Sequence, residues 1–340
     1  MSTTRWTNRP EGSTWGDWGP DDQLGRLNLI GPEQVKKGIA EVETGKTFCL
    51  SLPLDLPGGN VLSPVRFPPA LRPVIRNDAP YFNYNWQEFD PRFPDIAADD
   101  AVLLYTQYST QWDALAHRGS NFDVMGDGVD VPVYYNGFRA GEDLTMDSGE
   151  NGHVTCAHKL GIENFAAHGL QGRGVLINLH KHFGDTRHDV SYDDLMRVME
   201  ADNITVEEGD MLLLWTGIDK MILAGAGNPD PAIKKACAVL DGHDKRLLQW
   251  ITDSGVAALI SDNIAVEAAG NPLPDDYCGS ILPLHEHCLF KLGVPLAELW
   301  QLCDLAEWLE AQGRSRFLLT APPLRLTGAV GSPATPIATV

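Results

Sequence analysis

The chain has 340 residues, of which 43% are apolar and 21% are charged, and its formal net charge is −20. This composition is typical of a globular protein that can bury a large core. The negative charge argues against nucleic acid and anionic membrane as partners, because phosphate groups need Lys and Arg for neutralisation. An anionic substrate would need local positive charge from an arginine or a metal ion.

No stretch of about 18 apolar residues occurs that would cross a bilayer. The first residues lack the apolar segment of a signal peptide, and the six cysteines form no CxxC pair, which is typical of reduced thiols. We therefore expect a cytoplasmic protein without a disulfide framework.

The first third of the chain predicts few regular elements. Residues 1–30 are rich in Trp, Gly and Asp and predict an irregular N-terminal arm. A helix is expected over 32–45 and a strand over 47–56. Residues 57–98 contain many prolines and aromatic residues without a clean period, which predicts a long loop acting as a lid or a subunit contact. Residues 101–117 open as a buried strand.

The remainder alternates between helical and strand patterns, which predicts an α/β fold in a single domain over residues 1–340. The expected elements are a helix at 152–168, a strand at 175–179, a helix at 192–203, a strand at 206–217, a helix at 245–255, a strand at 256–267, an interrupted helix at 284–300 and a strand at 317–326. Ser191 is the expected N-cap of the helix at 192–203.

Several common active-site motifs are absent. The Gly45-Lys46-Thr47 segment lacks the first glycine of a P-loop, since Ala40 stands in its place. The glycines of residues 169–174 do not have dinucleotide-binding spacing. Neither the GxSxG turn of a serine hydrolase nor the HExxH helix of a zinc protease occurs.

The strongest candidate for chemistry is the segment that contains Gln107, Gln111, Asp113 and His117. The first three lie an even number of residues apart, so on extended backbone their side chains share one face. His117 is reachable across a turn. A carboxylate and an imidazole can hold a divalent ion or form an acid–base pair. The competing interpretation is that these buried polar groups only hydrogen-bond one another.

Weaker candidates occur further along the chain. His285, Glu286 and His287 with Glu298 offer imidazole and carboxylate groups for the same ion, although a solvated surface cluster is the favoured reading from spacing alone. His180 and His182 follow the predicted strand at 175–179 and form a further possible ligand pair.

The end of another predicted strand is also polar. Asp262, Asn263 and Glu267 lie where sites gather in α/β sheets, but capping of a turn explains them equally well.

Four segments taken together resemble the cyclase-like metal-dependent hydrolases, the family of bacterial kynurenine formamidase and isatin hydrolase. The segments are WGDWGPDDQLGRLN at 15–28, GIENFAAHGLQGRGVL at 161–176, GDMLLLWTG at 209–217 and GSPATPIA at 331–338. The resemblance covers nearly the whole chain. It implies a mixed-sheet β/β/α arrangement of the swivelling-domain type around a central site, in a homodimer or homotetramer.

The metal motif of that family, HxGTHxDxPxH, is only partly present. Asp113 and His117 match it, but Gln107 and Gln111 stand in place of its first two histidines. The later family ligands fall on His285 and Glu298. The resemblance thus implies one divalent ion held by Asp113, His117, His285 and Glu298. The glutamine amide oxygen is a harder and weaker ligand than imidazole. The expected ion therefore shifts from zinc towards manganese or magnesium, and the alternative is that no ion is bound.

Three functions follow, in order of preference. The first is metal-dependent hydrolysis of a C–N amide, lactam or related cyclic bond of a small molecule, with Asp113, His117, Gln111 and Gln107 as catalytic residues. The second is a metal-free lyase, hydratase or isomerase in which Asp113 orients His117. The third is a catalytically silent protein that binds a small molecule.

Overall fold

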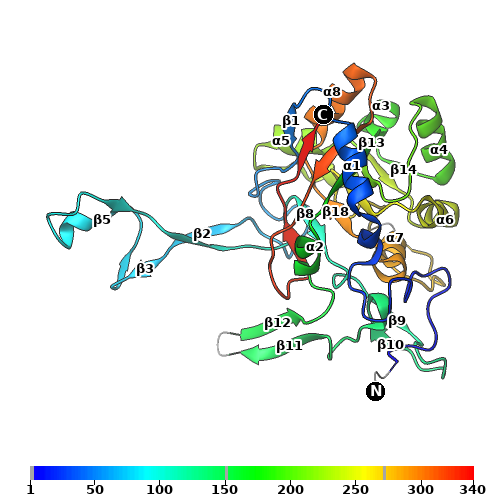
Figure 1. Cartoon of the computed structure of the whole chain (residues 1–340), viewed down its shortest axis with the longest axis horizontal. Helices are drawn as coiled ribbons and strands as arrows, with labels where there is room; N and C mark the ends of the chain where they lie inside the picture. The colour runs from blue at the N-terminus through cyan, green and yellow to red at the C-terminus, as the bar shows by residue number, and fades with distance from the viewer. Residues whose placement is uncertain (1–3, 150–151, 271–272) are drawn as a thin grey trace.

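The apolar runs of the sequence form the centre of one large sheet in the computed structural model, which describes residues 4–149, 152–270 and 273–340. Nine strands lie in the order β1-β21-β19-β13-β15-β17-β18-β8-β20 (Figure 1). In that order they span Thr47–Cys49, Ile337–Thr339, Arg316–Thr320, Gln171–Asn178, Met211–Trp215, Ala258–Ser261, Leu296–Glu298, Gln111–Asp113 and Gly331–Pro333. β13, β15, β17 and β18 are parallel, and the outer pairs are antiparallel.

Helices connect the parallel strands and cover the sheet (Figure 1). They are α1 Pro32–Ala40, α2 Glu163–His168, α3 Leu179–Phe183, α4 Tyr192–Ala201, α5 Ile218–Gly225, α6 Lys245–Ser254, α7 Pro283–His285 and α8 Cys303–Gln312. A π-helical turn, η5, spans Glu286–Leu292. The 3₁₀ turns are η1 Gly25–Leu29, η2 Trp86–Glu88, η3 Tyr135–Gly137 and η4 Pro231–Lys235. Within the described part of the chain, none of the helices combines the length and apolar character of a bilayer span.

Local sequence accounts for the best-defined elements. All five residues of β15 are buried, as expected of a strand covered on both faces. The Ser191 hydroxyl accepts from the Asp194 N–H, and the Asp194 carboxylate accepts from the Ser191 N–H, which makes a capping box at the start of α4. Gly255 ends α6 in the left-handed conformation at φ 67°.

A long arm, residues 65–105, leaves the body of the molecule (Figure 1). It consists of three short antiparallel pairs. These pairs are β2 Ala70–Pro73 with β7 Asp100–Leu103, β3 Ile75–Arg76 with β4 Ala79–Pro80, and β5 Tyr84–Asn85 with β6 Ile96–Ala97. The prediction of a loop over 57–98 is therefore corrected. The arm strands are exposed, so they lack the alternation of apolar and polar residues by which a half-buried strand is recognised in a sequence.

The other two-stranded pairs lie closer to the body. They are β9 Ser120–Phe122 with β10 Val131–Val133, β11 Leu144–Gly149 with β12 Gly152–Ala157, and β14 His188–Val190 with β16 Ala238–Leu240. The predicted helix at 152–168 is thus wrong in its first half, where β12 pairs with β11, and correct only at α2.

Two further expectations near the site are wrong. The strand that opens at residue 101 is β7, which is exposed in the arm, and the polar segment instead has its own core strand, β8. The interruption predicted near Gly293 is correct, since the helical turn ends there with φ 61°, but Pro295 leads into β18 where a second helical segment was expected. Pairing of β18 with both β17 and β8 outweighs the helical preference of Leu296, Ala297 and Glu298.

Candidate functional site

Two neighbouring strands place three polar side chains together. β8 and β18 pair in a register that sets Gln111 opposite Glu298 and Asp113 opposite Leu296. Because side chains two residues apart on a strand share a face, Gln111, Asp113 and Glu298 lie on one side of the sheet. Their exposed fractions are 1%, 0% and 4%. The even spacing in the sequence therefore predicted the shared face of Gln111 and Asp113 correctly, whereas Gln107 lies in the turn before β8 and not on extended backbone.

His285 reaches the same point from the connection between β17 and β18. Glu267 accepts bonds of 2.9 Å from the backbone N–H groups of Leu284 and His285, and its Oε1 lies 2.8 Å from the Nδ1 atom of His285. This contact places a proton on Nδ1 and turns Nε2 towards Glu298, where it lies 3.4 Å from Oε1. Glu267 thus orients His285, a role that the sequence left open.

His117 lies at the edge of this cluster. Its N–H donates to the Ala114 carbonyl over 2.8 Å, which makes the expected turn after β8. The Nε2 atom of His117 is 3.9 Å from Oδ1 of Asp113. Its Nδ1 atom faces the amide nitrogen of Gln107 at 3.4 Å, and because that nitrogen can only donate, the neutral ring carries its proton on Nε2.

The cluster fits a divalent cation. Asp113 is fully buried, and neither of its carboxylate oxygens has a hydrogen-bond partner among the described residues. One ligand atom from each of Asp113, His285 and Glu298 lies within 4.8 Å of the others. Two carboxylates with one imidazole suit manganese, zinc or magnesium. Burial of a carboxyl group without hydrogen-bond partners is costly unless the group is protonated or faces a cation. The ligand types and their geometry therefore both fit a bound cation.

The electrostatics of the cluster follow from burial and close charges. Burial, and then the nearby Glu298 carboxylate, raise the pKa of Asp113 to about 8. Burial, and then the charge of His285, lower the pKa of His117 to about 4, so its ring is neutral at neutral pH. Burial opposes the charge on His285, but hydrogen bonds with Glu267 and Glu298 prevail and raise its pKa to about 9. Burial likewise opposes ionisation of Glu298, but its hydrogen bond with His285 lowers its pKa overall.

The Gln111 amide has two possible orientations. In one, its nitrogen lies 3.4 Å from Oε2 of Glu298. In the other, the nitrogen donates to the carbonyls of Ser109 and Gln107 over 3.1 and 2.7 Å. The second makes two shorter bonds and leaves the amide oxygen facing the Glu298 carboxylate. Two oxygens that face each other favour a cation between them.

Two arginines near the cluster were not recognised in the sequence. Arg66 donates to the Gln107 carbonyl over 2.8 Å from the root of the arm, and Arg118 directly follows His117. The positive charges of both lower the pKa of Asp113, although burial outweighs them. Within the described part of the chain, neither has a carboxylate within ion-pair distance. The position of Arg118 next to the motif was the available signal.

The other sequence candidates lie elsewhere and have ordinary partners. His287 contacts the Thr252 hydroxyl at 2.9 Å, and Glu286 accepts from Ser120 at the same distance. His180 and His182 lie in α3, where they pair with Asp185 and Asp202 over 2.8 Å each. The structure does not bring these groups to the cluster.

Asp262 and Asn263 also serve the backbone. Asp262 accepts from the N–H groups of Thr216 and Gly217 over 2.8 Å each, and the Asn263 amide nitrogen donates to the Ala238 carbonyl over 3.3 Å. Capping of a turn therefore describes Asp262 best.

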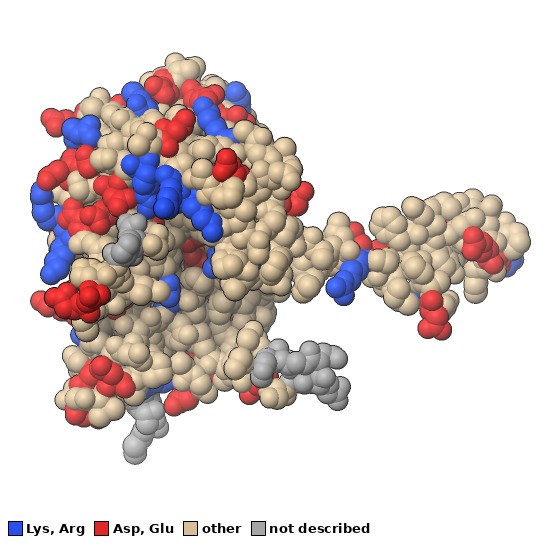
Figure 2. Space-filling model, turned by 180° about the vertical axis from the view of Figure 1, so that it is seen from behind, with Lys and Arg blue, Asp and Glu red and all other residues tan. Residues whose placement is uncertain are grey.

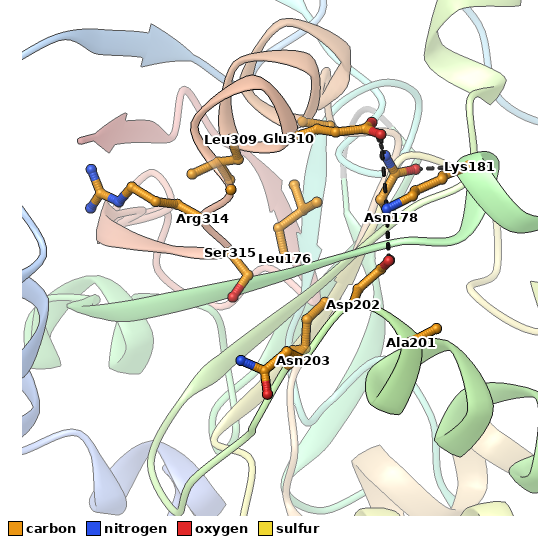
Figure 3. Close-up of a pocket in the computed structure, with 13 residues that line it drawn as sticks. Leu176, Asn178, Lys181, Ala201, Asp202, Asn203, Leu309, Glu310, Arg314 and Ser315 are labelled. Carbon is orange, nitrogen blue, oxygen red and sulfur yellow. Dashed lines mark hydrogen bonds and ion pairs between the residues drawn. The ribbon is translucent and has the colours of Figure 1, made fainter.

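A separate pocket of about 360 Å³ lies between β13, α4 and α8 (Figure 3). Several of its polar side chains already pair with one another. Lys181 donates to Asp202 over 2.7 Å, and Asn178 donates to Glu310 over 3.0 Å. The pocket shares no residue with the Asp113 cluster and is not a candidate for the chemistry.

Comparison with known proteins assigns the chain to a family. Residues 50–268 match the sequence profile of the family described as putative cyclase. A solved structure described as a novel cyclase is 31% identical and covers 96% of this chain and 97% of its own, with a TM-score of 0.73. No curated protein matches the chain.

Two isatin hydrolases share the fold at lower identity. Isatin hydrolase A from Labrenzia aggregata, bound to benzyl benzoate, is 15% identical with a TM-score of 0.53, covering 87% of this chain and 93% of its own. An isatin hydrolase bound to the product analogue thioisatinate is also 15% identical, with a TM-score of 0.52, covering 92% and 99%. The mixed α/β architecture expected from the sequence is thereby confirmed, and the chain belongs to the putative cyclase family.

Proposed function

We propose that this protein is a metal-dependent hydrolase that cleaves a C–N amide, lactam or related cyclic bond of a small molecule. The observation that carries the proposal is the buried Asp113 carboxylate, which has no hydrogen-bond partner among the residues that the structure describes and faces His285 and Glu298. Membership of the cyclase family and the fold shared with isatin hydrolases support it. The expected ion is manganese or zinc, with magnesium as a third choice.

The residues divide into those that hold the ion and those that handle the substrate. Asp113, His285 and Glu298 would hold the cation, with the Gln111 oxygen beside Glu298. When bound, a divalent ion supplies Lewis acidity towards a carbonyl and lowers the pKa of a water molecule.

His117 has a different role. Its Nε2–H faces Asp113, so it is a donor that can hold the carbonyl oxygen or give a proton to the leaving nitrogen. Gln107 fixes this tautomer through Nδ1. A ligand role for His117, which the sequence resemblance implied, would require the opposite tautomer.

The two arginines favour a substrate with a negatively charged or oxygen-rich group. In a chain of net charge −20, a guanidinium beside a buried site, without a carboxylate partner among the described residues, is the local positive charge that an anionic substrate needs. Arg118 is the better candidate, since Arg66 is already bonded to the Gln107 carbonyl. Arg118→Gln is expected to raise KM for an anionic substrate more than it lowers kcat.

Elemental mass spectrometry of the purified protein tests the metal. About one divalent ion per chain is expected in the wild type and none in Asp113→Asn. Glu286→Gln is the matched control, because its side chain lies next to His285 in sequence but contacts Ser120. A screen of amides and lactams follows, with activity removed by a chelator and restored by manganese or zinc. A chelator-resistant rate on each substrate that is turned over would refute the hydrolase proposal.

A second candidate is a metal-free lyase, hydratase or isomerase. The observations that favour it are the glutamines at 107 and 111 and the approach of His117 to Asp113 at 3.9 Å. In that case Asp113, whose pKa is raised to about 8, and neutral His117 would exchange a proton with the substrate. A stoichiometric ion that Asp113→Asn loses excludes this candidate.

A further inference from the structure

A second cluster of reactive side chains lies outside the Asp113 cluster, on the hairpin of β11 and β12 that extends from the body (Figure 1). Thr145 and Cys156 are paired residues of that hairpin, and His158 directly follows the end of β12. The Nδ1 atom of His158 lies 3.5 Å from Sγ of Cys156, and its Nε2 atom lies 3.0 Å from Oγ1 of Thr145. The thiol, the imidazole and the hydroxyl therefore have the order of a nucleophile, its base and the group that orients the base.

The two contacts of the His158 ring suit its protonated form. When the Cys156 thiol gives its proton to Nδ1, both ring nitrogens carry hydrogen, and they donate to the thiolate sulfur and to the Thr145 oxygen. The hydroxyl of Thr145 can accept in this state as readily as it can donate to a neutral ring. Both bonds therefore persist when the charges separate, which favours the thiolate, the form of cysteine that reacts.

The surroundings of the thiol leave it open to small molecules from solvent. Cys156 is partly exposed and His158 is exposed, so both groups can be reached. The absence of a side chain at Gly328 provides the room for the sulfur, because a Cβ atom there would come within 2.7 Å of Sγ. Figure 2 shows that the body carries many charged groups, with acidic ones prominent among them, and an uncharged oxidant is not repelled by such a surface.

The other five cysteines lack this combination of exposure and a neighbouring base. Burial raises the pKa of the thiols of Cys237, Cys288 and Cys303, which keeps them protonated. Cys49 and Cys278 are exposed, but among the described residues no imidazole lies within hydrogen-bond distance of either. These two thiols therefore show what exposure alone contributes to reactivity.

We infer that Cys156 is a site of reversible oxidation by hydrogen peroxide, with His158 as its base. His158 takes the thiol proton, and an electron pair of the sulfur attacks one peroxide oxygen. The S–O bond forms as the O–O bond breaks, so the sulfur is oxidised by two electrons and the peroxide is reduced. The leaving hydroxide takes the proton from His158 and departs as water, which leaves a sulfenic acid that a second thiol can reduce again. The inference is independent of the proposed reaction.

Competition among the cysteines of the folded wild-type protein tests the inference. The protein is treated with substoichiometric hydrogen peroxide in the presence of dimedone, which traps sulfenic acids, and the labelled peptides are quantified by mass spectrometry. An ordinary thiol is only a few per cent ionised near neutral pH, so Cys156 is expected to be labelled about 10-fold faster than Cys49 or Cys278. Equal labelling of the three cysteines overturns the inference.

Variants of the hairpin separate the base from its surroundings. His158→Gln keeps a polar side chain but removes the base, so labelling of Cys156 is expected to fall to the level of the two exposed cysteines. Lys159→Gln is the matched control, because it removes a positive charge from the next exposed position and leaves the imidazole in place, and it is expected to keep the wild-type rate. Circular dichroism establishes that each variant is folded. A folded His158→Gln protein that keeps the wild-type rate overturns the inference, as does a Lys159→Gln protein that loses it.

Thr145 provides a second test if His158→Gln does not fold. Thr145→Val removes the hydroxyl that accepts from His158 and is expected to lower the labelling of Cys156, whereas Thr145→Ser retains the hydroxyl and is expected to keep it. Equal rates for these two variants overturn the inference.

Discussion

The proposed chemistry depends on Asp113, because the contacts of this side chain do not explain its burial by packing or hydrogen bonding alone. A buried carboxyl group normally has hydrogen-bond donors, as Asp262 does with two backbone N–H groups. Asp113 has none among the described residues and instead faces an imidazole and a second carboxylate. Natural sequences accept such a cost chiefly at functional sites.

Glu267 is expected to tune the cation affinity without contacting the cation. Glu267→Gln weakens the orientation of His285 and leaves one acceptor oxygen in place of the two that bind the Leu284 and His285 N–H groups separately. Loss of an orienting partner of this kind lowers metal affinity by about 10- to 100-fold. Competition with a chelator measures the affinity, and thermal unfolding of the metal-free variant measures stability. Unchanged affinity with lower stability would mean that Glu267 only supports the fold.

His117 is expected to act on the substrate and not on the cation. His117→Gln removes the N–H that faces Asp113, so the rate should fall by about 10²- to 10⁴-fold. The metal content should stay at the wild-type value, because Asp113, His285 and Glu298 remain. Elemental analysis beside kinetics distinguishes the two roles. Loss of the ion in this variant would instead make His117 a ligand, as the family motif implies.

At the residue scale, the sequence predicted which residues lie in the Asp113 cluster better than it predicted what each of them does. Periodicity placed Gln111 and Asp113 on one face, because a strand alternates strictly. It could not show that Glu298 lies opposite Gln111, since strand register depends on contacts between distant segments. The role of Glu267 was equally hidden, because a capping group and an orienting group look alike in sequence.

At the element scale, an ion-pair network ties α1 and β13 to the turn before β15. Arg173 contacts Glu207 at 2.9 Å and Asp210 at 2.8 Å, and Lys37 reaches Glu207 at 3.0 Å. The hydrogen bonds with Lys37 and Arg173 lower the pKa of Glu207 from its ordinary 4.5 to about 2. The folded state therefore favours the ionised form of this side chain.

This network predicts a stability difference that depends on pH. A carboxylate with a lowered pKa stabilises the fold fully above about pH 4.5, and the contribution disappears as the pH falls through about 2. Glu207→Gln should therefore have a lower urea midpoint than the wild type at neutral pH and the same midpoint near pH 2. Glu208→Gln, at an exposed neighbouring position, should match the wild type throughout. A difference for Glu207→Gln that persists at low pH would contradict the electrostatic origin.

The errors in predicted elements have a common physical cause. The segments at 101–103 and 296–298 form strands whose partners come from distant parts of the chain, whereas the segment at 152–157 pairs with its neighbour at 144–149. Local pattern identifies an apolar run but not whether a helix, a core strand or an exposed strand uses it. Elements with strong local signals, such as the capping box at Ser191 or the Gly255 end of α6, were predicted correctly.

At the scale of the whole molecule, one continuous sheet accounts for the body, and the arm stands apart from it (Figure 1). From composition alone, the sequence predicted that residues 57–98 form a long loop acting as a lid or a subunit contact. It did not predict strands there, because neither face of the arm is buried in a single chain and no alternation of apolar and polar residues results.

The homodimer or homotetramer that the family resemblance implies leads to a prediction about salt, which follows from where the charge lies. Two chains of net charge −20 repel at long range, and salt screens that repulsion over about 10 Å at 0.1 M. An interface built from the exposed apolar residues of the arm loses little from the same screening, so such an oligomer should become tighter as sodium chloride is raised. Sedimentation equilibrium across a range of salt concentrations measures the effect. A dimer that weakens with salt would mean that ion pairs hold the copies together, in which case the exposed apolar residues of the arm serve another purpose.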